Sequence, residues 1–367
     1  MNRYIKLLLL FLMICLFSLL CCNIFNDDEY NFELKERIIS TRKQNDFFVT
    51  GIKSKNYLLS YDDDLNSYFF SHDFDISSIK IISPYNVKYM INKVKDNQYS
   101  IFIYSDKYFQ EKTITLLDIP IVSIKSPPFF NSLVDITKND EDELVSNPLS
   151  YKISFNLYQS YSKLGSNIGN YKGIMTERGR TSFLFEKKSY KIKFDSAISL
   201  LGMAKDDDWI LDALYTDKSK IRNKLSCDLW NIINDNQRIN NDLDGQFVEV
   251  FMDNHYLGLY VLKEKVDKKI TGVTNDGLLA KSIDHITGMR VDNYDIFNYG
   301  DFLNDNILIE NFEVKYYTKA SLKNFFSKLN VLYNSKRNYD LISNTFYLDN
   351  YINYKIFLSF IYGVDNV

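Results

Sequence analysis

The chain has 367 residues, which is long for a single domain and favours two folded units. Hydrophobic residues make up 46% of it, enough for a sizeable core, and this excludes an intrinsically disordered protein. With 44 basic and 47 acidic side chains, the formal net charge is -3. That near balance provides no electrostatic footprint for nucleic acid and no basic surface for an anionic membrane, so we expect no nucleic-acid partner.

The first residues have the pattern of a secretory leader. Residues 2–6 form a short basic start, and residues 7–22 are almost entirely apolar. We therefore expect residues 1–22 to be a signal peptide or lipoprotein leader, with an uncleaved signal anchor as the alternative. Cys21 and Cys22 both stand at the end of the apolar run, and the sequence leaves open which of them carries a lipid. The expected location is secreted or lipid-anchored, outside the cytoplasm, with membrane contact only through such an anchor.

Cysteine and histidine usage predicts neither disulfides nor a metal site. Cys227 is the one cysteine outside the leader, and it lies in an apolar helical pattern typical of a buried, inert thiol. The three histidines, His72, His255 and His285, are scattered without the spacing of metal ligands. We therefore expect no zinc centre and no cysteine–histidine nucleophile pair.

Short strand-like runs occupy the segment that follows. Residues 79–82, 87–90 and 99–104 are rich in β-branched and aromatic side chains, and turn-forming residues separate them. Their spacing predicts a small β-sandwich of the immunoglobulin-like kind over residues 30–125. The prolines in residues 126–128 end the pattern, so we place a domain boundary there.

Two short motifs favour structural interpretations. Residues 62–64 are three consecutive aspartates, which predict a solvated turn, because a calcium loop would alternate its ligands. Gly165, Gly169 and Gly173 are spaced four apart, which matches neither the GxGxxG motif nor a Walker A loop. We expect these glycines to lie in a surface loop.

The remainder of the chain alternates strand and helix patterns. Residues 151–158 and 190–194 alternate apolar and polar side chains like half-buried strands, with Tyr190, Ile192 and Phe194 on one face. Two further strands, 246–253 and 255–262, are expected to meet at a tight turn. Patterns of helical period then predict helices at 321–333 and 349–362, and the periodicity alone indicates only an α+β fold.

Another helix is expected after Thr216, with one apolar face. That face would be formed by side chains at helical spacing, namely Ile221, Leu225, Leu229, Ile232 and Ile233. Asp217, Arg222 and Asn223 are expected to cap and fix this helix rather than to touch a substrate.

Five blocks of sequence between residues 173 and 267 occur in a distinctive order. They are Glu177–Arg180, Lys187–Phe194, Asp206–Leu211, Asp217–Leu225 and Gly258–Asp267. In order and spacing these blocks resemble the CotH family, named for a spore coat protein and regarded as atypical, secreted protein kinases. The resemblance covers roughly the C-terminal two-thirds of the chain. It implies an α+β protein in which an immunoglobulin-like sandwich precedes an atypical two-lobed protein-kinase-like domain, at residues 126–367, that is incomplete at its C-terminus.

The resemblance also implies a reaction and its cofactors. A CotH-like kinase would transfer the γ-phosphoryl of ATP, with Mg²⁺, to Ser or Thr hydroxyls of coat or surface proteins. Phosphoryl transfer needs positive charge over the phosphates, a carboxylate that holds a lysine, and a base near the acceptor hydroxyl. Carried over by position, Arg178 and Lys188 would hold phosphates, with Lys191 as the second choice of lysine.

Three acidic residues complete the implied site. Glu264 and Asp267 would lie near the nucleotide, holding a lysine or accepting from the ribose or base. Asp365 would be the catalytic aspartate that orients or deprotonates the acceptor hydroxyl. Several of these assignments have a purely structural alternative. Arg178 could be an ordinary surface arginine, and Lys188 and Lys191 could be solubilising lysines on an exposed strand. Glu264 and Asp267 could belong to a charged loop after a strand.

The end of the chain departs from the family pattern. Asn366 is directly beside Asp365, whereas the family places an asparagine a few residues later, and no Trp-Asp-x-Asp element follows. We therefore expect either a fragment of a longer kinase or a truncated, inactive relative. The alternative function is a non-catalytic scaffold or pseudokinase that binds protein partners in coat or surface assembly. A third interpretation, a carbohydrate-binding module, depends only on the abundance of aromatic residues.

Overall fold

The computed structural model describes most of the chain beyond the leader. The described residues lie within 31–126, 135–138, 144–147, 150–159, 168–179, 185–234, 244–282, 312–328 and 338–361, with gaps at 47, 56, 72–73, 268, 275–276, 317, 319, 322, 326 and 346. The expected leader at 1–22 and the expected base Asp365 both lie outside these residues. In the described part of the chain, no helix is long and apolar enough to cross a membrane.

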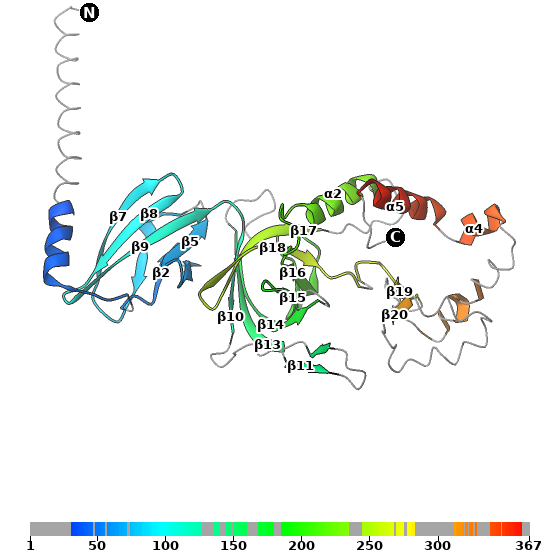
Figure 1. The fold of residues 1–367 in the computed structure, drawn as a ribbon, viewed down its shortest axis with the longest axis horizontal. Coiled ribbons are helices and arrows are strands. Elements are labelled where there is room, and N and C mark those ends of the chain that lie inside the picture. Colours follow the sequence, from blue (N-terminus) through cyan, green and yellow to red (C-terminus); the bar gives the residue numbers. More distant parts are fainter. Residues whose placement is uncertain are drawn as a thin grey trace, which may run out of the picture. The chain divides into compact units, whose positions relative to one another are not determined.

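The fold is mixed α+β and rich in sheet, and the chain divides into two compact units (Figure 1). The first unit comprises residues 1–130, 153–171 and 248–258, and the second comprises 131–152, 172–247 and 259–367. The finer expectations stay predictions: an immunoglobulin-like sandwich at 30–125 and a two-lobed kinase-like domain at 126–367.

Two sheets build the N-terminal part of the first unit, after a helical segment at 31–41. The larger sheet has the order β4-β5-β9-β8-β7, and β1 pairs with β9. Its strands are β1 (Lys43–Gln44), β4 (Ser60–Asp62), β5 (Ser67–Ser71), β7 (Lys88–Lys95), β8 (Gln98–Tyr104) and β9 (Tyr108–Leu117). The smaller sheet contains β3 (Tyr57–Leu58), β2 (Gly51–Ser54) and β6 (Lys80–Ile82), and a single turn of helix, η1 (Ile76–Ser78), precedes β6. The predicted strands at 79–82, 87–90 and 99–104 are confirmed.

One hydrophobic core joins these two sheets. Ile52 of the smaller sheet and Phe70, Ile101, Ile103 and Ile114 of the larger sheet belong to a single buried cluster. Because side chains alternate along a strand, Ile101 and Ile103 of β8, and Ile114 and Leu116 of β9, point to this cluster. Burial of these apolar faces holds the two sheets together.

Seven further strands close into a barrel in the order β10-β13-β14-β15-β16-β18-β17. Their bounds are β10 (Ile121–Lys125), β13 (Ser150–Tyr158), β14 (Ile168–Arg178), β15 (Ser189–Ile198), β16 (Asp206–Asp212), β17 (Gly245–Met252) and β18 (His255–Glu264). The four strands predicted after residue 150 are all present. Tyr190, Ile192 and Phe194 are buried together, as their alternation predicts. Trp209 is fully buried, and its indole N–H donates to the carbonyl of Asp206 at 3.0 Å.

The hairpin between β17 and β18 turns at Asp253 and Asn254, as predicted. Both residues have positive φ, 50° and 68°, which a two-residue hairpin turn of this kind requires. The solvated-turn interpretation of residues 62–64 is wrong for Asp62, whose side chain is buried. Its carboxylate accepts the backbone N–H of Leu65 at 2.6 Å and that of Tyr256 at 2.5 Å, so it ties the β4–β5 turn to the start of β18.

The second unit also contains helices. They are α2 (Arg222–Asn234), α4 (Tyr339–Thr345) and α5 (Leu348–Phe360), and the described residues between 320 and 328 are also helical. Two small hairpins complete the unit, β11 (Asp135–Lys138) with β12 (Leu144–Asn147) and β19 (Leu279–Ser282) with β20 (Phe312–Tyr316).

Helix α2 packs on α5 through an aromatic contact. The ring of Trp230 lies 5.5 Å from that of Tyr354 and 5.4 Å from that of Phe357. The predicted apolar stripe of α2 is instead largely exposed, with Ile232 at 70%. Among the described residues, Trp230 therefore supplies the aromatic contact of α2 with α5, while most of the stripe is exposed. Cys227 is half-buried, and burial raises the pKa of its thiol, in keeping with an inert cysteine.

The surface-loop interpretation of the glycines is wrong for Gly169 and Gly173, which lie within β14; Gly165 lies outside the described residues. A Cβ atom at Gly173 would stand 2.4 Å from the carbonyl oxygen of Lys193 and 3.0 Å from the Cα of Phe194. Only glycine lets the backbone of β15 approach this closely.

We predict that Gly173→Ala lowers the free energy of unfolding by about 1–3 kcal/mol, because backbone of β15 must move to admit the methyl group. Urea denaturation of the full chain measures this. Lys172→Ala, at the exposed neighbouring position of β14, is the control. Equal midpoints for the two variants would show that the close approach is not needed.

Candidate functional site

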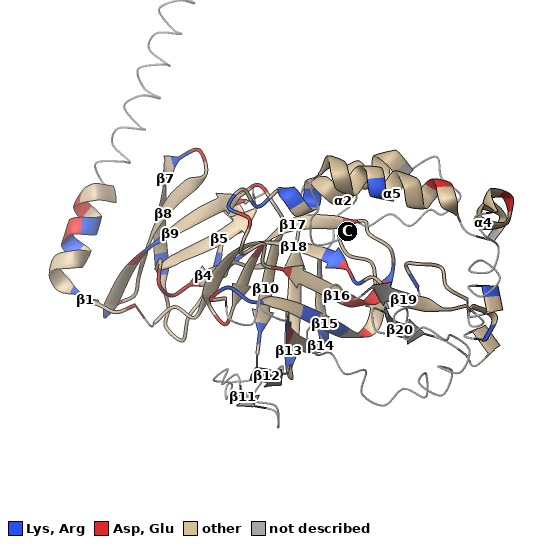
Figure 2. Ribbon diagram, turned by 45° about the vertical axis from the view of Figure 1, so that its right-hand side comes forward, with Lys and Arg blue, Asp and Glu red and all other residues tan. Residues whose placement is uncertain are grey.

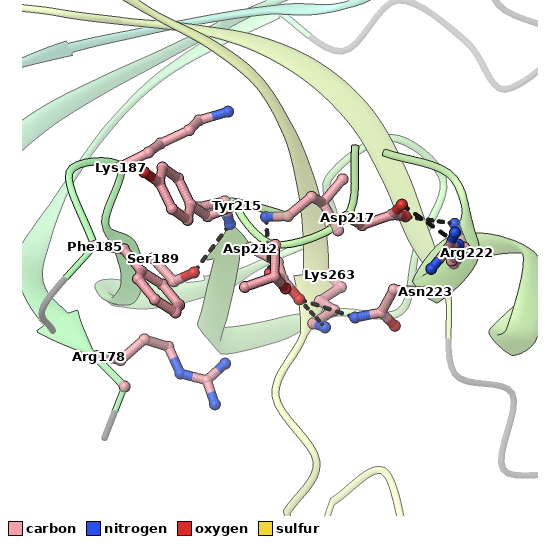
Figure 3. A pocket seen from close by; sticks show the side chains of 14 residues that line it. Arg178, Phe185, Lys187, Ser189, Asp212, Tyr215, Asp217, Arg222, Asn223 and Lys263 are labelled. Atoms are coloured by element: carbon pink, nitrogen blue, oxygen red, sulfur yellow. Dashed lines mark hydrogen bonds and ion pairs between the residues drawn. The ribbon is translucent and has the colours of Figure 1, made fainter. Parts of the chain in front are cut away.

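A cavity of about 390 Å³ opens in the second unit, where β14 and β16 end near the start of α2 (Figure 3). Four cationic side chains line it: Arg178, Lys187, Arg222 and Lys263. The acidic side chains in the lining are Asp212 and Asp217. The lining therefore carries an excess of positive charge, and the chemistry that it favours is the binding of an anion.

Strand alternation decides which side chains face this cavity. Arg178 pairs with Ser189 across β14 and β15, and both line the cavity. Their neighbours Glu177 and Tyr190 form the next pair, and both are buried on the opposite face. The same alternation sends Lys263 of β18 to the cavity.

Asp212, the last residue of β16, is the hub of the polar contacts in the cavity. Its Oδ2 accepts a hydrogen bond from Lys263 Nζ at 2.5 Å and another from Asn223 Nδ2 at 3.2 Å. Its Oδ1 accepts the backbone N–H of Leu214 at 3.3 Å. Burial alone would raise the pKa of Asp212, but the Lys263 ammonium outweighs it and holds that pKa below its ordinary value. The carboxylate is thus ionised and fixed in place.

Two of the four cations have other partners. Lys187 Nζ donates to the carbonyl of Leu259 at 2.5 Å and lies 4.1 Å from the ring centroid of Tyr260. Arg222 lies beside Asp217, with 3.7 Å between Nε and Oδ1. Asp217 also accepts the backbone N–H of Arg222 at 2.9 Å, which confirms its predicted capping role at α2.

Among the residues predicted from sequence to bind the nucleotide, Arg178 is the one that the structure places in the lining of this cavity. Lys188 lies next to the lining residue Lys187, and its carbonyl accepts the hydroxyl of Tyr260 at 3.0 Å. Burial raises the pKa of the Glu177 carboxyl, and the charge of Lys188 acts against that rise. These contacts place Lys188 beside groups on the inner face of the barrel.

Lys191 belongs to a network of ion pairs around Asp206, Asp207 and Asp208. Figure 2 colours the basic and acidic positions along the ribbon of β15 and β16. Lys191 Nζ lies 3.4 Å from a carboxylate oxygen of Asp208. The other lysines of the network are Lys193, Lys265 and Lys269. Hydrogen bonds from Lys193 and Lys269 hold the pKa of Asp207 far below its ordinary value. These lysines therefore neutralise carboxylates outside the cavity.

Glu264 and Asp267 are buried and do not line the cavity. Glu264 is 6% exposed, and its Oε1 has no hydrogen-bond partner among the described residues. Burial raises the pKa of Glu264 to about 7, against the opposing effect of a hydrogen bond from the backbone of Ala204. Asp267 accepts the backbone N–H of Lys269 at 2.7 Å and so shapes the turn after β18.

Sequence reasoning missed Lys263 and Asp212. The alternation of β18 could have indicated Lys263. Leu262 and Glu264 are buried on the inner face of the barrel, so the side chain between them points outward, to the side of the cavity. Asp212 had no comparable signal, since its role depends on Lys263 and Asn223, which are distant in sequence. In the described part of the chain, no group of three or more His, Cys, Asp or Glu side chains is arranged to hold a metal ion.

Comparison with known proteins identifies a family match. The family model described as CotH kinase protein matches residues 175–367, which is 193 of the 367 residues. The matched region contains every residue that lines the cavity. No curated protein matches the chain.

The buried carboxyl of Glu264 predicts a pH dependence of stability. Its pKa is about 7 in the folded protein against a reference value of 4.5, so the folded state binds this proton more tightly than the unfolded state. The contribution of Glu264 to the free energy of unfolding is therefore most favourable below pH 4.5 and falls as the pH rises through 7. Glu264→Gln should stabilise the protein at pH 8 by roughly 1–3 kcal/mol and change little near pH 4.5.

Urea denaturation of the wild type and the variant at several pH values measures this difference. Glu36→Gln, which changes an exposed glutamate, is the control. A Glu264→Gln effect of the same size at every pH would contradict the assignment, because the loss of a titrating group cannot produce it.

Proposed function

This chain belongs to the CotH kinase family, and on that premise we propose that its second unit acts as a protein kinase domain. The reaction is the transfer of the γ-phosphoryl of ATP to Ser or Thr hydroxyls of coat or surface proteins. Membership itself supports a kinase-related function, with ATP and a metal ion used at the level of the family. The observation that carries the proposal is the cationic cavity within the family-matched region.

The cavity suits the phosphate chain of a nucleotide. Its volume of about 390 Å³ lies within the usual range for small-molecule sites, ~300–1,000 Å³. Arg178 presents a planar guanidinium, which can donate two parallel hydrogen bonds to phosphate oxygens. Gly179 follows it with a φ of 141°, so no side chain stands between the backbone and a ligand at this edge of the cavity.

Mg²⁺ supplies charge neutralisation at the phosphates in kinases. Among the described side chains, no group of three or more acidic or histidine ligands is arranged to hold the ion, and we assign no residue to it. The proposed roles are therefore those of protein side chains. Arg178 binds phosphate oxygens, and Asp365, which lies outside the described residues, accepts the proton of the acceptor hydroxyl.

The other residues assigned from sequence stay predictions. Lys188 and Lys191 as phosphate ligands, and Glu264 and Asp267 as nucleotide neighbours, depend on the family resemblance. Their observed contacts give each of them a structural role as well. Lys188 and Glu264 contribute to the inner face of the barrel, Lys191 to the ion-pair network, and Asp267 to the turn after β18.

The setting of the reaction is proposed to be extracytoplasmic. Association of the family with the spore coat is consistent with a surface location, and the apolar leader of residues 1–22 favours secretion or a lipid anchor. The two sheets of the first unit are proposed to form an immunoglobulin-like module that binds a protein partner.

A phosphotransfer assay tests the proposal. The full chain is incubated with γ-labelled ATP, Mg²⁺ and casein as a generic Ser/Thr acceptor. Asp365→Asn should lower transfer at least about 100-fold, because the base is lost, and should leave ATP affinity within about twofold. Arg178→Ala should weaken ATP binding about tenfold or more, because a charge-assisted hydrogen bond to phosphate is lost. Calorimetry measures both affinities.

The outcomes separate the competing functions. Binding of ATP without transfer by the wild type would favour the non-catalytic scaffold or pseudokinase. Failure of the wild type to bind ATP, with or without Mg²⁺, would contradict a nucleotide-dependent function.

A further inference from the structure

The four cations of the cavity differ in what they can offer a ligand. Lys187 is directed to Leu259 and Tyr260, and Arg222 lies beside Asp217. The other two, Arg178 and Lys263, interact with the same carboxylate, Asp212. Figure 3 shows both of these cations facing the cavity near that aspartate.

Lys263 is held in one position but retains free donors. An ammonium group has three N–H donors, and Asp212 is the hydrogen-bond partner of Lys263 among the described residues. The side chain is 24% exposed, so the remaining donors can reach a ligand in the cavity. Asn223, on the first turn of α2, donates to the same Oδ2 of Asp212 and restrains the carboxylate from the other side.

Arg178 presents a planar guanidinium, which complements the single ammonium group of Lys263. It makes no hydrogen bond to another described side chain, and it is an exposed residue at the end of β14. Burial lowers the pKa of Arg178 somewhat, and the charge of Asp212 opposes that shift. A guanidinium remains protonated at any physiological pH, so this group stays a cation.

The barrel register identifies the sequence-based candidate that is best compared with Lys263. Ile210 of β16 pairs with Lys191 of β15 on one side and with Lys263 of β18 on the other. Both lysines therefore share one face of the sheet, at the same level. Lys191, however, pairs with Asp208 and does not line the cavity.

We propose that Lys263, fixed by its ion pair with Asp212, is the lysine of this chain that binds the phosphate chain of the nucleotide, together with Arg178. This inference rests on the proposed nucleotide-binding function of the cavity. It assigns the phosphate contact to a residue outside the sequence-based choice of Lys188 and Lys191. Asp212 also balances one positive charge when the cavity is empty, which limits the repulsion between Arg178 and Lys263.

The test measures the binding of two probes, inorganic tripolyphosphate and ATP, to the full chain by calorimetry without divalent cations. Lys263→Met should weaken both probes about 10- to 30-fold, because a charge-assisted contact to phosphate is lost. Lys191→Met distinguishes the two candidate lysines: affinity within about twofold of the wild type supports Lys263, and a loss as large as that of Lys263→Met would overturn the assignment. Lys172→Met, at an exposed position of β14 outside the lining, is the control. Arg178→Ala combined with Lys263→Met should lose less than the product of the single losses, because both side chains hold the same group.

A further variant excludes an indirect effect. Removing Lys263 exposes the charge of Asp212, which by itself would repel phosphate. In the double variant Lys263→Met with Asp212→Asn this repulsion is absent, and no carboxylate is left unpaired, so the fold is also protected. We expect affinity to remain reduced. Recovery of wild-type affinity would overturn the proposal, since the lysine would then only mask Asp212. Melting temperatures of all variants confirm that they are folded.

The failures of the two claims are distinguishable. Tight ATP binding that Lys263→Met leaves unchanged would overturn the role of Lys263 and leave the proposed function standing. Binding of tripolyphosphate but not ATP, with the predicted loss in Lys263→Met, would support the lysine assignment and contradict the nucleotide. Absence of binding for both probes would overturn both.

Discussion

Strict alternation of side chains along the barrel strands is the constraint on which the site depends. Along β14, Glu177 is buried while Arg178 lines the cavity; along β18, Glu264 is buried while Lys263 lines it. A shift of one residue in either strand would exchange these faces, placing cations in the core and carboxylates in the cavity. Gly173 allows the close approach of β14 and β15, in the register that pairs Arg178 with Ser189.

Charge on the second unit is organised in two ways. Around Asp206–Asp208, lysines and carboxylates form ion pairs in nearly equal numbers, so they neutralise one another within the protein. In the cavity, Asp212 alone stands between Arg178 and Lys263, so positive charge is left over for a ligand. The first arrangement stabilises the turn after β18, and the second supplies a site. The basic side chains of the two regions therefore differ in how many carboxylates they pair with, and not in residue type.

Much of the barrel could be predicted from the sequence, and less of the site. Strands such as 190–194 have strong period-two patterns, and Asp253–Asn254 favours the tight turn that the hairpin adopts. The family resemblance favours Lys188 and Lys191 and does not single out Lys263, because a sequence shows lysines without their partners. The exposed stripe of α2 and the buried Asp62 were missed for a related reason. Both depend on tertiary contacts, made by Trp230 and by the backbone of Tyr256, that no local pattern encodes.

The most direct measurement of the central claim is a crystal structure of the full chain with a non-hydrolysable ATP analogue. We predict phosphate oxygens within hydrogen-bond distance of Arg178 and Lys263, with Asp212 still bound to Lys263. A nucleotide whose phosphates contact Lys188 or Lys191 while the cavity stays empty would contradict it.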